Sequence, residues 1–297
     1  MLKQPQTLGG DYSAFESSSE NATKVCANLP DEMVHRFSLS LHPAQLGTDV
    51  RDSFIGLMGD QAGFIDSISF ITALKLSELA CGIAEALNHA QFRIAVMCCR
   101  ALYEEAAAAR LYLGEVRAAL EALRVVPAST FRLRRLKSMA ANRRDEFASL
   151  LKTVSAANAS LRKWHSATKI DIGKPDFFDN YKLAADDPLY QKFTLRGLKE
   201  IKWGGKPAEM FYALLCDATH PNVGAVGLYI EEVKIAGHRI EHKIKRDRKS
   251  SDVYWYVFDL ICRPTIECVA ILLQFLDEMR LEKQRLDCFL RKVRATT

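Results

Sequence analysis

The sequence predicts a mainly α-helical fold, a multi-helix bundle with one small β-hairpin inserted near residues 226–245. Three observations favour this fold class. Long stretches repeat apolar residues at the spacing of a helix. Only one short segment alternates like paired strands around a glycine. Hydrophobic residues make up 48% of the 297 residues and charged residues 26%, which is enough to build a sizeable core.

Residues 1–28 are predicted to form a flexible tail. They are rich in Ser, Gln, Asn and Gly and contain few large apolar side chains. No apolar stretch of signal-peptide length occurs between residues 1 and 20. We therefore expect a protein of the cytoplasm.

Residues 29–60 are predicted to hold a short helix followed by an irregular connection. Asp31 is placed to cap that helix, which ends before Pro43. Three glycines within residues 49–63 favour a loop. Residues 61–297 then form a single helical domain.

Two long helices are expected at the start of this domain. Apolar residues recur at helical spacing from Ile65 to Leu87, and a second helix runs from about Gln91 to Leu113. The second helix is apolar nearly all the way round, which indicates a central position in the bundle. Gly114 is predicted to mark a bend.

The second half of the domain is more varied. A long charged helix is predicted from Ser129, and loops with short helices over residues 170–206. A compact helix is expected over residues 208–219, before the hairpin. A buried helix over 253–279 and a charged amphipathic helix over 281–293 follow.

Composition excludes several classes of protein. The eight cysteines contain no C-x-x-C pair, so a zinc ribbon or thioredoxin-type site is not predicted, and we interpret them as reduced thiols. The sequence contains no glycine-rich phosphate loop, no H-E-x-x-H and no EF-hand pattern. We expect no metal and no cofactor. The apolar stretch 253–275 carries three charges, so no membrane-spanning helix and no membrane partner are predicted.

A first candidate site lies on the second helix. Arg100 and Glu104 are four residues apart and share one face with apolar neighbours. Charges in such surroundings need partners. They form either a structural ion pair that fixes helix packing or a polar seam that lines a pocket.

A second candidate site lies at the end of the 208–219 helix. His220 precedes a proline, with Asp217 three residues before it and Asn222 two residues after it. A histidine beside a carboxylate can serve as an acid or a base near neutral pH. The alternative is a histidine that caps the helix and forms a local salt bridge.

A third candidate is a charged stripe made by Asp259, Arg263 and Glu267 at intervals of four residues. Because buried charges need partners, we infer that this stripe faces Arg100 and Glu104, or His220, across the core. The alternative is that the three side chains face solvent.

Basic residues form a fourth feature, with a net charge of +5 over the chain. Three runs stand out, and each is a candidate phosphate contact or a solvated surface. The runs are Arg132, Arg134, Arg135, Lys137, Arg143 and Arg144; Lys243, Lys245, Arg246, Arg248 and Lys249; and Arg291, Lys292 and Arg294.

A family resemblance follows from these motifs. Arg100-x-x-x-Glu104, Tyr112-Leu113 and the later stretch Ala213-Leu-Leu-Cys-Asp-Ala-Thr-His220-Pro221-Asn222 resemble an uncharacterised bacterial family of helical proteins. That family is grouped near the HEPN superfamily (higher eukaryotes and prokaryotes nucleotide-binding). The resemblance covers about residues 60–280.

HEPN-like proteins are helical bundles, and many are toxins or anti-phage effectors that cut RNA as dimers. The resemblance therefore implies RNA as a partner, a homodimer, and a metal-independent ribonuclease if the chain is an enzyme. The ribonuclease signature of that superfamily is Arg, four to six residues, then His. Arg36 and His42 fit this spacing outside the matched region, whereas His220 has no such arginine before it.

Two hypotheses follow. In the first, the chain is a HEPN-like protein of phage defence or toxin-type stress response that binds or cleaves RNA. His220 is then the acid–base residue or the phosphate contact, and Arg100 and Glu104 organise the pocket. In the alternative, it is a non-catalytic helical interaction or regulatory module with a structural polar seam.

Overall fold

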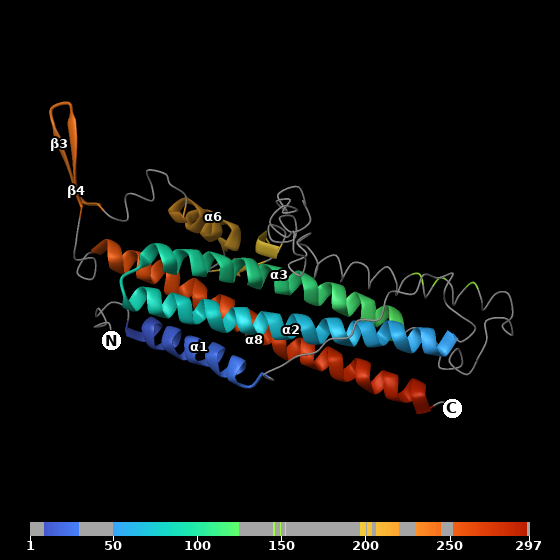
Figure 1. The fold of residues 1–297 in the computed structure, drawn as a ribbon. Helices are drawn as coiled ribbons and strands as arrows, with labels where there is room; N and C mark the ends of the chain where they lie inside the picture. Colours follow the sequence, from blue (N-terminus) through green and yellow to red (C-terminus); the bar gives the residue numbers. More distant parts are fainter. Residues whose placement is uncertain are drawn as a thin grey trace, which may run out of the picture. The chain divides into compact units, whose positions relative to one another are not determined.

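The computed structural model describes residues 9–29, 50–124, 145, 149, 152, 197–199, 201–203, 206–219, 230–244 and 252–295. Most of these residues are helical. The only strands among them form two small antiparallel pairs (Figure 1). The predicted fold class, mainly α with a small hairpin, is confirmed.

Internal contacts divide the chain into two compact units. Unit 1 comprises Met1–Leu29, Thr72–Ala109 and Thr194–Gln274, and unit 2 comprises Pro30–Ile71, Arg110–Phe193 and Phe275–Thr297. Each unit is assembled from three separate stretches of chain. The predicted ranges 1–28, 29–60 and 61–297 therefore do not coincide with these units.

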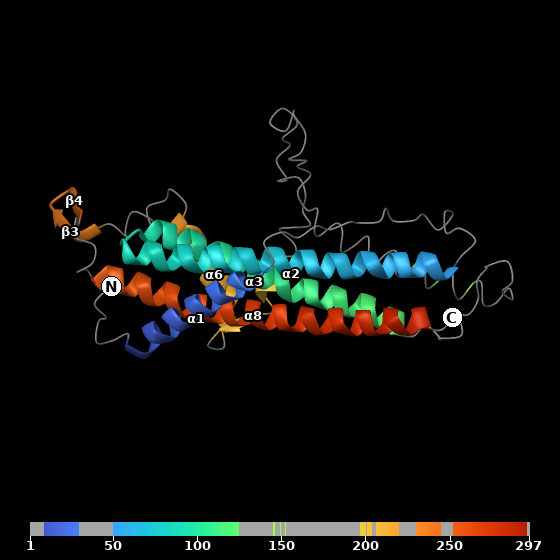
Figure 2. The ribbon, with the colours of Figure 1, turned by 60° about the horizontal axis from the view of Figure 1, so that its bottom comes forward.

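Three long helices contribute to both units. They are α2 (Val50–Asn88), α3 (Phe92–Arg124) and α8 (Asp252–Ala295). Within each unit, its segments of these helices lie side by side in both ribbon views (Figures 1 and 2). Unit 1 also contains α1 (Gly9–Ala27), α6 (Ala208–Thr219) and the four short strands.

Helix α1 shows that the predicted flexible tail was wrong for residues 9–27. Phe15 and Ala22 are buried, with 2% and 0% of their surface exposed, and they lie seven residues apart on one face. The Oγ1 atom of Thr23 lies 3.3 Å from Sγ of Cys81 in α2. A serine-rich composition hid this helix, because a packed helix needs only one apolar face.

Helix α2 shows that the irregular connection predicted over residues 49–63 was wrong from residue 50 onward. Gly56 and Gly59 have open space where a Cβ would lie, so no close packing requires a glycine there. Each costs the helix about 1 kcal/mol relative to alanine. Burial of Met58 and Phe64, at 0% and 4% exposure, offsets that cost.

A tight turn joins α2 to α3 within unit 1, close to the predicted helix ends. Ala90 adopts a left-handed conformation, with φ of 55°. Its N–H donates to the carbonyl of Leu87 at 3.1 Å, and the N–H of Gln91 donates to the carbonyl of Ala86 at 2.7 Å. This pair of hydrogen bonds is the Schellman motif that ends many helices.

Helix α3 runs unbroken through Gly114, so the predicted bend was wrong. The glycine is exposed and open, while Tyr112 and Val116 on either side of it are buried. The apolar stripe therefore continues across the glycine. The alanines from 106 to 109 are all buried, at 0–8% exposure, as the central position of this helix required.

A short helical piece at residues 197–199 packs directly on α3 in unit 1. A Cβ added to Gly197 would lie 2.3 Å from the carbonyl oxygen of Ala107. Only a glycine opposite a small residue permits this approach of two backbones.

The strands β1 (Lys202–Trp203) and β2 (Lys206–Pro207) follow the residue 197–199 piece and pair with each other. The sequence prediction of loops and short helices missed them. Helix α6 then starts at Ala208, whose N–H donates to the carbonyl of Ile201 at 2.9 Å. Both predicted ends of this helix are confirmed.

The predicted hairpin consists of β3 (Ile230–Ala236) and β4 (Arg239–Ile244), paired antiparallel. Two residues, Gly237 and His238, connect the strands, and Gly237 has a φ of +62°. Glycine at the first central position fits the type II′ turn that two-residue hairpins favour.

Helix α8 is one helix of 44 residues where two were predicted. Its buried stripe continues through Phe275, Met279 and Leu286 without a break. Pro264 lies inside the helix and is buried. Next to it, the hydroxyl of Thr265 donates to the carbonyl of Ile261 at 2.7 Å.

A charged cluster joins α3 to α8 in unit 2. Arg117 contacts Glu278 through Nη2 at 2.6 Å and Glu282 through Nε at 3.5 Å. Arg285 contacts the same carboxylate of Glu282 at 2.6 Å. The Glu282 side chain is 3% exposed, so its charge is buried with two cationic partners.

Within the described helices, the stretch Gln61–Asn88 of α2 is long and apolar enough to cross a membrane, by length and composition alone. The sequence prediction considered residues 253–275 and overlooked it. Of the most apolar window, 39% is buried, and Lys75 in this stretch pairs with Glu105 of α3 at 2.5 Å. The core helix of a soluble protein passes the same test.

Two predictions lie outside the described residues: the short helix capped by Asp31, and most of the charged helix from Ser129. Within the latter range, residues 145, 149 and 152 are helical and exposed.

Candidate functional site

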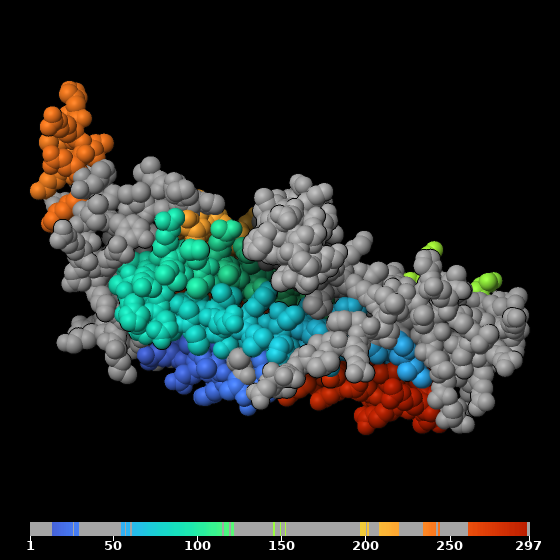
Figure 3. Space-filling view, in the orientation of Figure 1, coloured from blue at the N-terminus to red at the C-terminus, as the bar shows by residue number. Residues whose placement is uncertain are grey.

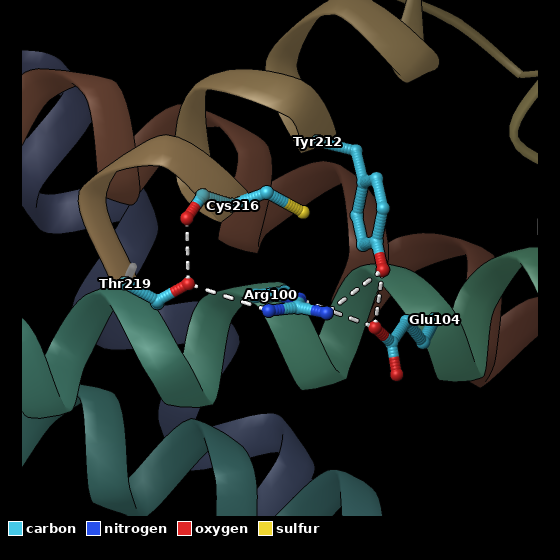
Figure 4. Close-up of polar contacts among 5 residues, drawn as sticks. All are labelled: Arg100, Glu104, Tyr212, Cys216 and Thr219. Carbon is cyan, nitrogen blue, oxygen red and sulfur yellow. Dashed lines mark hydrogen bonds and ion pairs between the residues drawn. The ribbon is translucent and has the colours of Figure 1, made fainter. Parts of the chain in front are cut away.

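A polar cluster between α3 and α6 of unit 1 contains the predicted Arg100–Glu104 pair (Figure 4). The Nε atom of Arg100 donates to Oε1 of Glu104 at 3.3 Å. Their side chains are 32% and 22% exposed. The pair is therefore half-buried, and solvent reaches both members.

Tyr212 of α6 connects the two charges. Its hydroxyl donates to Oε1 of Glu104 at 2.5 Å and accepts from Nη2 of Arg100 at 3.4 Å. The guanidinium carbon of Arg100 also lies 5.4 Å from the centre of the Tyr212 ring, within cation–π range.

These contacts set the protonation of the cluster. Burial, together with the hydrogen bond and the charge of Glu104, raises the pKa of Tyr212, so its phenol stays protonated and donates. Partial burial disfavours the charged form of Arg100. The hydrogen bond that its guanidinium donates to Tyr212, together with the carboxylate of Glu104, outweighs that effect and raises the pKa of Arg100.

Thr219 closes the cluster at the C-terminal end of α6. Its hydroxyl accepts from Nη1 of Arg100 at 3.3 Å and donates to the carbonyl of Cys216 at 2.8 Å. Its carbonyl accepts from Nη2 of Arg93 at 3.0 Å. Two guanidiniums from α3 therefore meet at one threonine, and the cluster holds one carboxylate among the residues that the structure describes. We call Arg93, Arg100, Glu104, Tyr212 and Thr219 the α3–α6 seam.

The structure thus brings together the two elements that carried the first two predicted sites. The contacting residues of α6 are Tyr212, Cys216 and Thr219, spaced four and three apart on one face. Asp217 is exposed, off that face. His220 and Asn222 lie outside the described residues, and Thr219 is the residue immediately before His220.

Two residues of the predicted charged stripe, Arg263 and Glu267, have described side chains. Arg263 and Glu267 are both exposed on α8, so the inference that the stripe faces the core was wrong for these two positions. Buried Pro264, Thr265 and Cys268 occupy the inward face instead. Asp259 is helical, and its side chain lies outside the described residues.

The residues that sequence reasoning missed are Tyr212, Thr219 and Arg93. Tyr212 and Thr219 could have been identified from the sequence, because they share a helical face with Ala208 and Leu215, which are buried. Sequence reasoning instead favoured the carboxylate of Asp217. No sequence pattern marked Arg93, whose contact is made through a backbone carbonyl.

Other predicted features fall differently. Arg36, His42 and the basic run from 132 to 144 lie outside the described residues. In the run near the C-terminus, Arg291, Lys292 and Arg294 are exposed on α8. Within the described ranges, no group of three or more His, Cys, Asp or Glu side chains is arranged to hold a metal ion.

Comparison with known proteins gives no relative: no protein-family model, curated protein or solved structure matches the chain.

Proposed function

We propose that this chain is a HEPN-like helical protein of the cytoplasm that binds RNA at the α3–α6 seam, in phage defence or a toxin-type stress response. One observation carries the proposal. Among the described residues, Arg93 and Arg100 meet at Thr219 beside a single carboxylate, so this part of the hydrogen-bonded cluster has an excess of positive charge. An RNA phosphate supplies the charge that would balance it.

The geometry suits a positioned phosphate contact. Arginine has five N–H donors, and the contacts of Arg100 within the chain engage one N–H on each of its three nitrogens. Two donors are thus without a partner among the described residues, on a side chain 32% exposed. Glu104 and Tyr212 hold the guanidinium in one orientation, which lowers the entropy cost of binding.

His220 has the catalytic role in this proposal, if the bound RNA is cleaved. It follows Thr219 directly, so its backbone is one residue from the point where the two arginines meet. A neutral imidazole would accept the proton of a ribose 2′-hydroxyl as that oxygen bonds to the neighbouring phosphorus. The P–O5′ bond then breaks, and the leaving 5′-oxygen takes a proton from the imidazolium, which leaves a 2′,3′-cyclic phosphate and a 5′-hydroxyl. The arginines would stabilise the added negative charge.

The test uses the full chain and a fluorescently labelled single-stranded RNA. We expect Arg100→Lys to weaken binding about tenfold, because an ammonium replaces a fork of donors. The matched control, Arg117→Lys, changes an arginine on the same helix in unit 2 and leaves affinity unchanged. His220→Ala should abolish any cleavage and retain binding. Equal affinity of the two lysine variants would contradict the proposal.

The alternative function is a non-catalytic interaction module whose seam is structural. A specific observation favours it: each nitrogen of Arg100 already has a partner within the chain. In addition, Arg93 donates to a carbonyl at the C-terminus of α6, where a cation stabilises the helix dipole. On this account Arg100→Ala lowers the free energy of unfolding and has no effect on RNA.

A further inference from the structure

The hairpin β3–β4 exposes large apolar side chains. Ile235 and Ile240 are directly paired across the strands and are 76% and 63% exposed. Figure 3 shows the described side chains of the hairpin in orange. Every side chain described in the hairpin, at positions 234–241 and 243, is exposed. An isolated two-stranded hairpin is only marginally stable in water. Pairing with a further strand would therefore stabilise β3–β4.

The two edges of the hairpin differ. Strand β3 contains an irregularity in register between Ile230 and Glu232, and such bulges twist an edge away from pairing. Strand β4 pairs without a shift from Arg239 to Lys243. The regular edge is therefore that of β4.

The backbone of β4 presents hydrogen-bonding groups at Ile240. In a two-residue hairpin the residues flanking the turn, here Ala236 and Arg239, form a hydrogen-bonded pair. The next pair, Ile235 and Ile240, is then not hydrogen-bonded. The N–H and C=O of Ile240 consequently point outward, away from β3.

We propose that β4 pairs edge to edge with β4 of a second copy of this chain, antiparallel and centred on Ile240. The outward N–H and C=O of Ile240 would exchange hydrogen bonds with those of the same residue in the second copy. Two hairpins would thus form one four-stranded sheet, with the exposed isoleucines side by side on one face.

Charge complementarity supports this register. Arg239 of each copy lies opposite Glu241 of the other, which gives two opposite-charge pairs around the central isoleucines. A register centred on Glu241 would set like charges against each other, with Arg239 opposite Lys243. It would also need outward backbone groups at Glu241, whose groups face β3.

The test measures the dimer dissociation constant of the full chain by sedimentation. Arg239→Glu and Glu241→Arg each turn both pairs repulsive, and each should weaken the dimer about tenfold or more. An equimolar mixture of the two variants restores both pairs and should restore dimerisation. Glu241 also pairs with Lys234 in its own hairpin, so Glu241→Arg changes the hairpin as well as the proposed interface. Recovery of the dimer in the mixture is therefore the deciding result.

Lys243→Glu is the matched control. In the proposed register this residue lies opposite Gly237, so the dimer should change by less than about twofold. A wild-type chain that stays monomeric at the highest soluble concentration would overturn the proposal, since another occupant must then cover the hairpin. So would an unchanged dimer in Arg239→Glu, or a mixture that fails to reassociate.

Discussion

Each half of α3 contributes an arginine to a polar cluster, Arg100 in unit 1 and Arg117 in unit 2, and the two arginines have different surroundings. Arg117 in unit 2 contacts two carboxylates, and one of these, Glu282, is shared with Arg285. In these contacts, two arginines face two glutamates, so the charges of the described cluster balance. Arg100 in unit 1 contacts one carboxylate and two hydroxyls, and Arg93 joins it at Thr219.

The difference separates a structural role from a ligand-binding role. A balanced cluster around a buried carboxylate has its charges satisfied within the chain. A half-buried cluster with an excess cation attracts an anion and keeps donors available for it. Helix α3 therefore carries both an arginine of the candidate binding site, Arg100, and an arginine for the control variants, Arg117.

The largest effect expected along α3 is at the contact between Gly197 and Ala107. A Cβ at position 197 would lie 2.3 Å from a backbone oxygen that cannot move aside. Gly197→Ala should therefore lower the free energy of unfolding by about 3 kcal/mol in urea denaturation. Gly114→Ala, in open space on the same helix, should raise it by about 0.5–1 kcal/mol. A matching loss in both variants would contradict the close contact.

The second-largest loss of stability is expected in the cluster of Arg117, Glu278, Glu282 and Arg285 in unit 2. Glu282→Ala removes a carboxylate that is 3% exposed and leaves two arginines without it. We expect a loss of about 2 kcal/mol in urea denaturation. Glu278→Ala, which removes a carboxylate 21% exposed, should cost less than about 1 kcal/mol. Equal losses would show that burial does not distinguish the two carboxylates.

Arg100→Ala should lower the free energy of unfolding by less than it would if Glu104 were fully buried. A buried, unpaired Glu104 would cost roughly 3–5 kcal/mol. Because Glu104 is 22% exposed and keeps its hydrogen bond from Tyr212, we expect Arg100→Ala to cost about 1 kcal/mol. Differential scanning calorimetry measures this loss. A cost above about 3 kcal/mol would favour the purely structural seam.

The buried thiol of Cys99 on α3 makes the free energy of unfolding depend on pH. Burial raises the pKa of Cys99 to about 12, against about 8.5 in an unfolded chain. Its contribution to stability is present below pH 8.5 and is lost as the pH rises toward the folded value. By pH 9.5 the loss should be about 1 kcal/mol. Cys99→Ala should remove this part of the pH dependence, while Cys288→Ala, at an exposed site, should retain it.

The elements that the sequence predicted well are those with strong local signals. The C-terminal end of α6 and the turn of the hairpin follow from Pro221 and Gly237, whose conformational preferences act locally. Glycines misled the prediction in α2 and at Gly114, because tertiary packing overrides a local propensity worth about 1 kcal/mol. Helix α1 was missed since its single stripe is short of large apolar residues.

The candidate site was predicted in part. Arg100 and Glu104 were identified by spacing, and their meeting with α6 follows from the need of half-buried charges for partners. The particular partners could not be predicted, because Tyr212 and Thr219 are neutral and give no charge signal. The outward position of Arg263 and Glu267 depends on how α8 is rotated, which the charge spacing alone does not determine.

The salt dependence of RNA affinity tests the central claim most directly. Two double variants each remove two positive charges: Arg93→Ala with Arg100→Ala in the seam, and Arg117→Ala with Arg285→Ala in unit 2. Each phosphate contact to single-stranded RNA contributes about 0.7 to the slope of log K against log salt concentration. Because the seam would hold one phosphate, we predict that the seam variant lowers the steepness by about 0.7 and that the unit 2 variant leaves it unchanged. Identical slopes for the two variants and the wild-type chain would contradict the account.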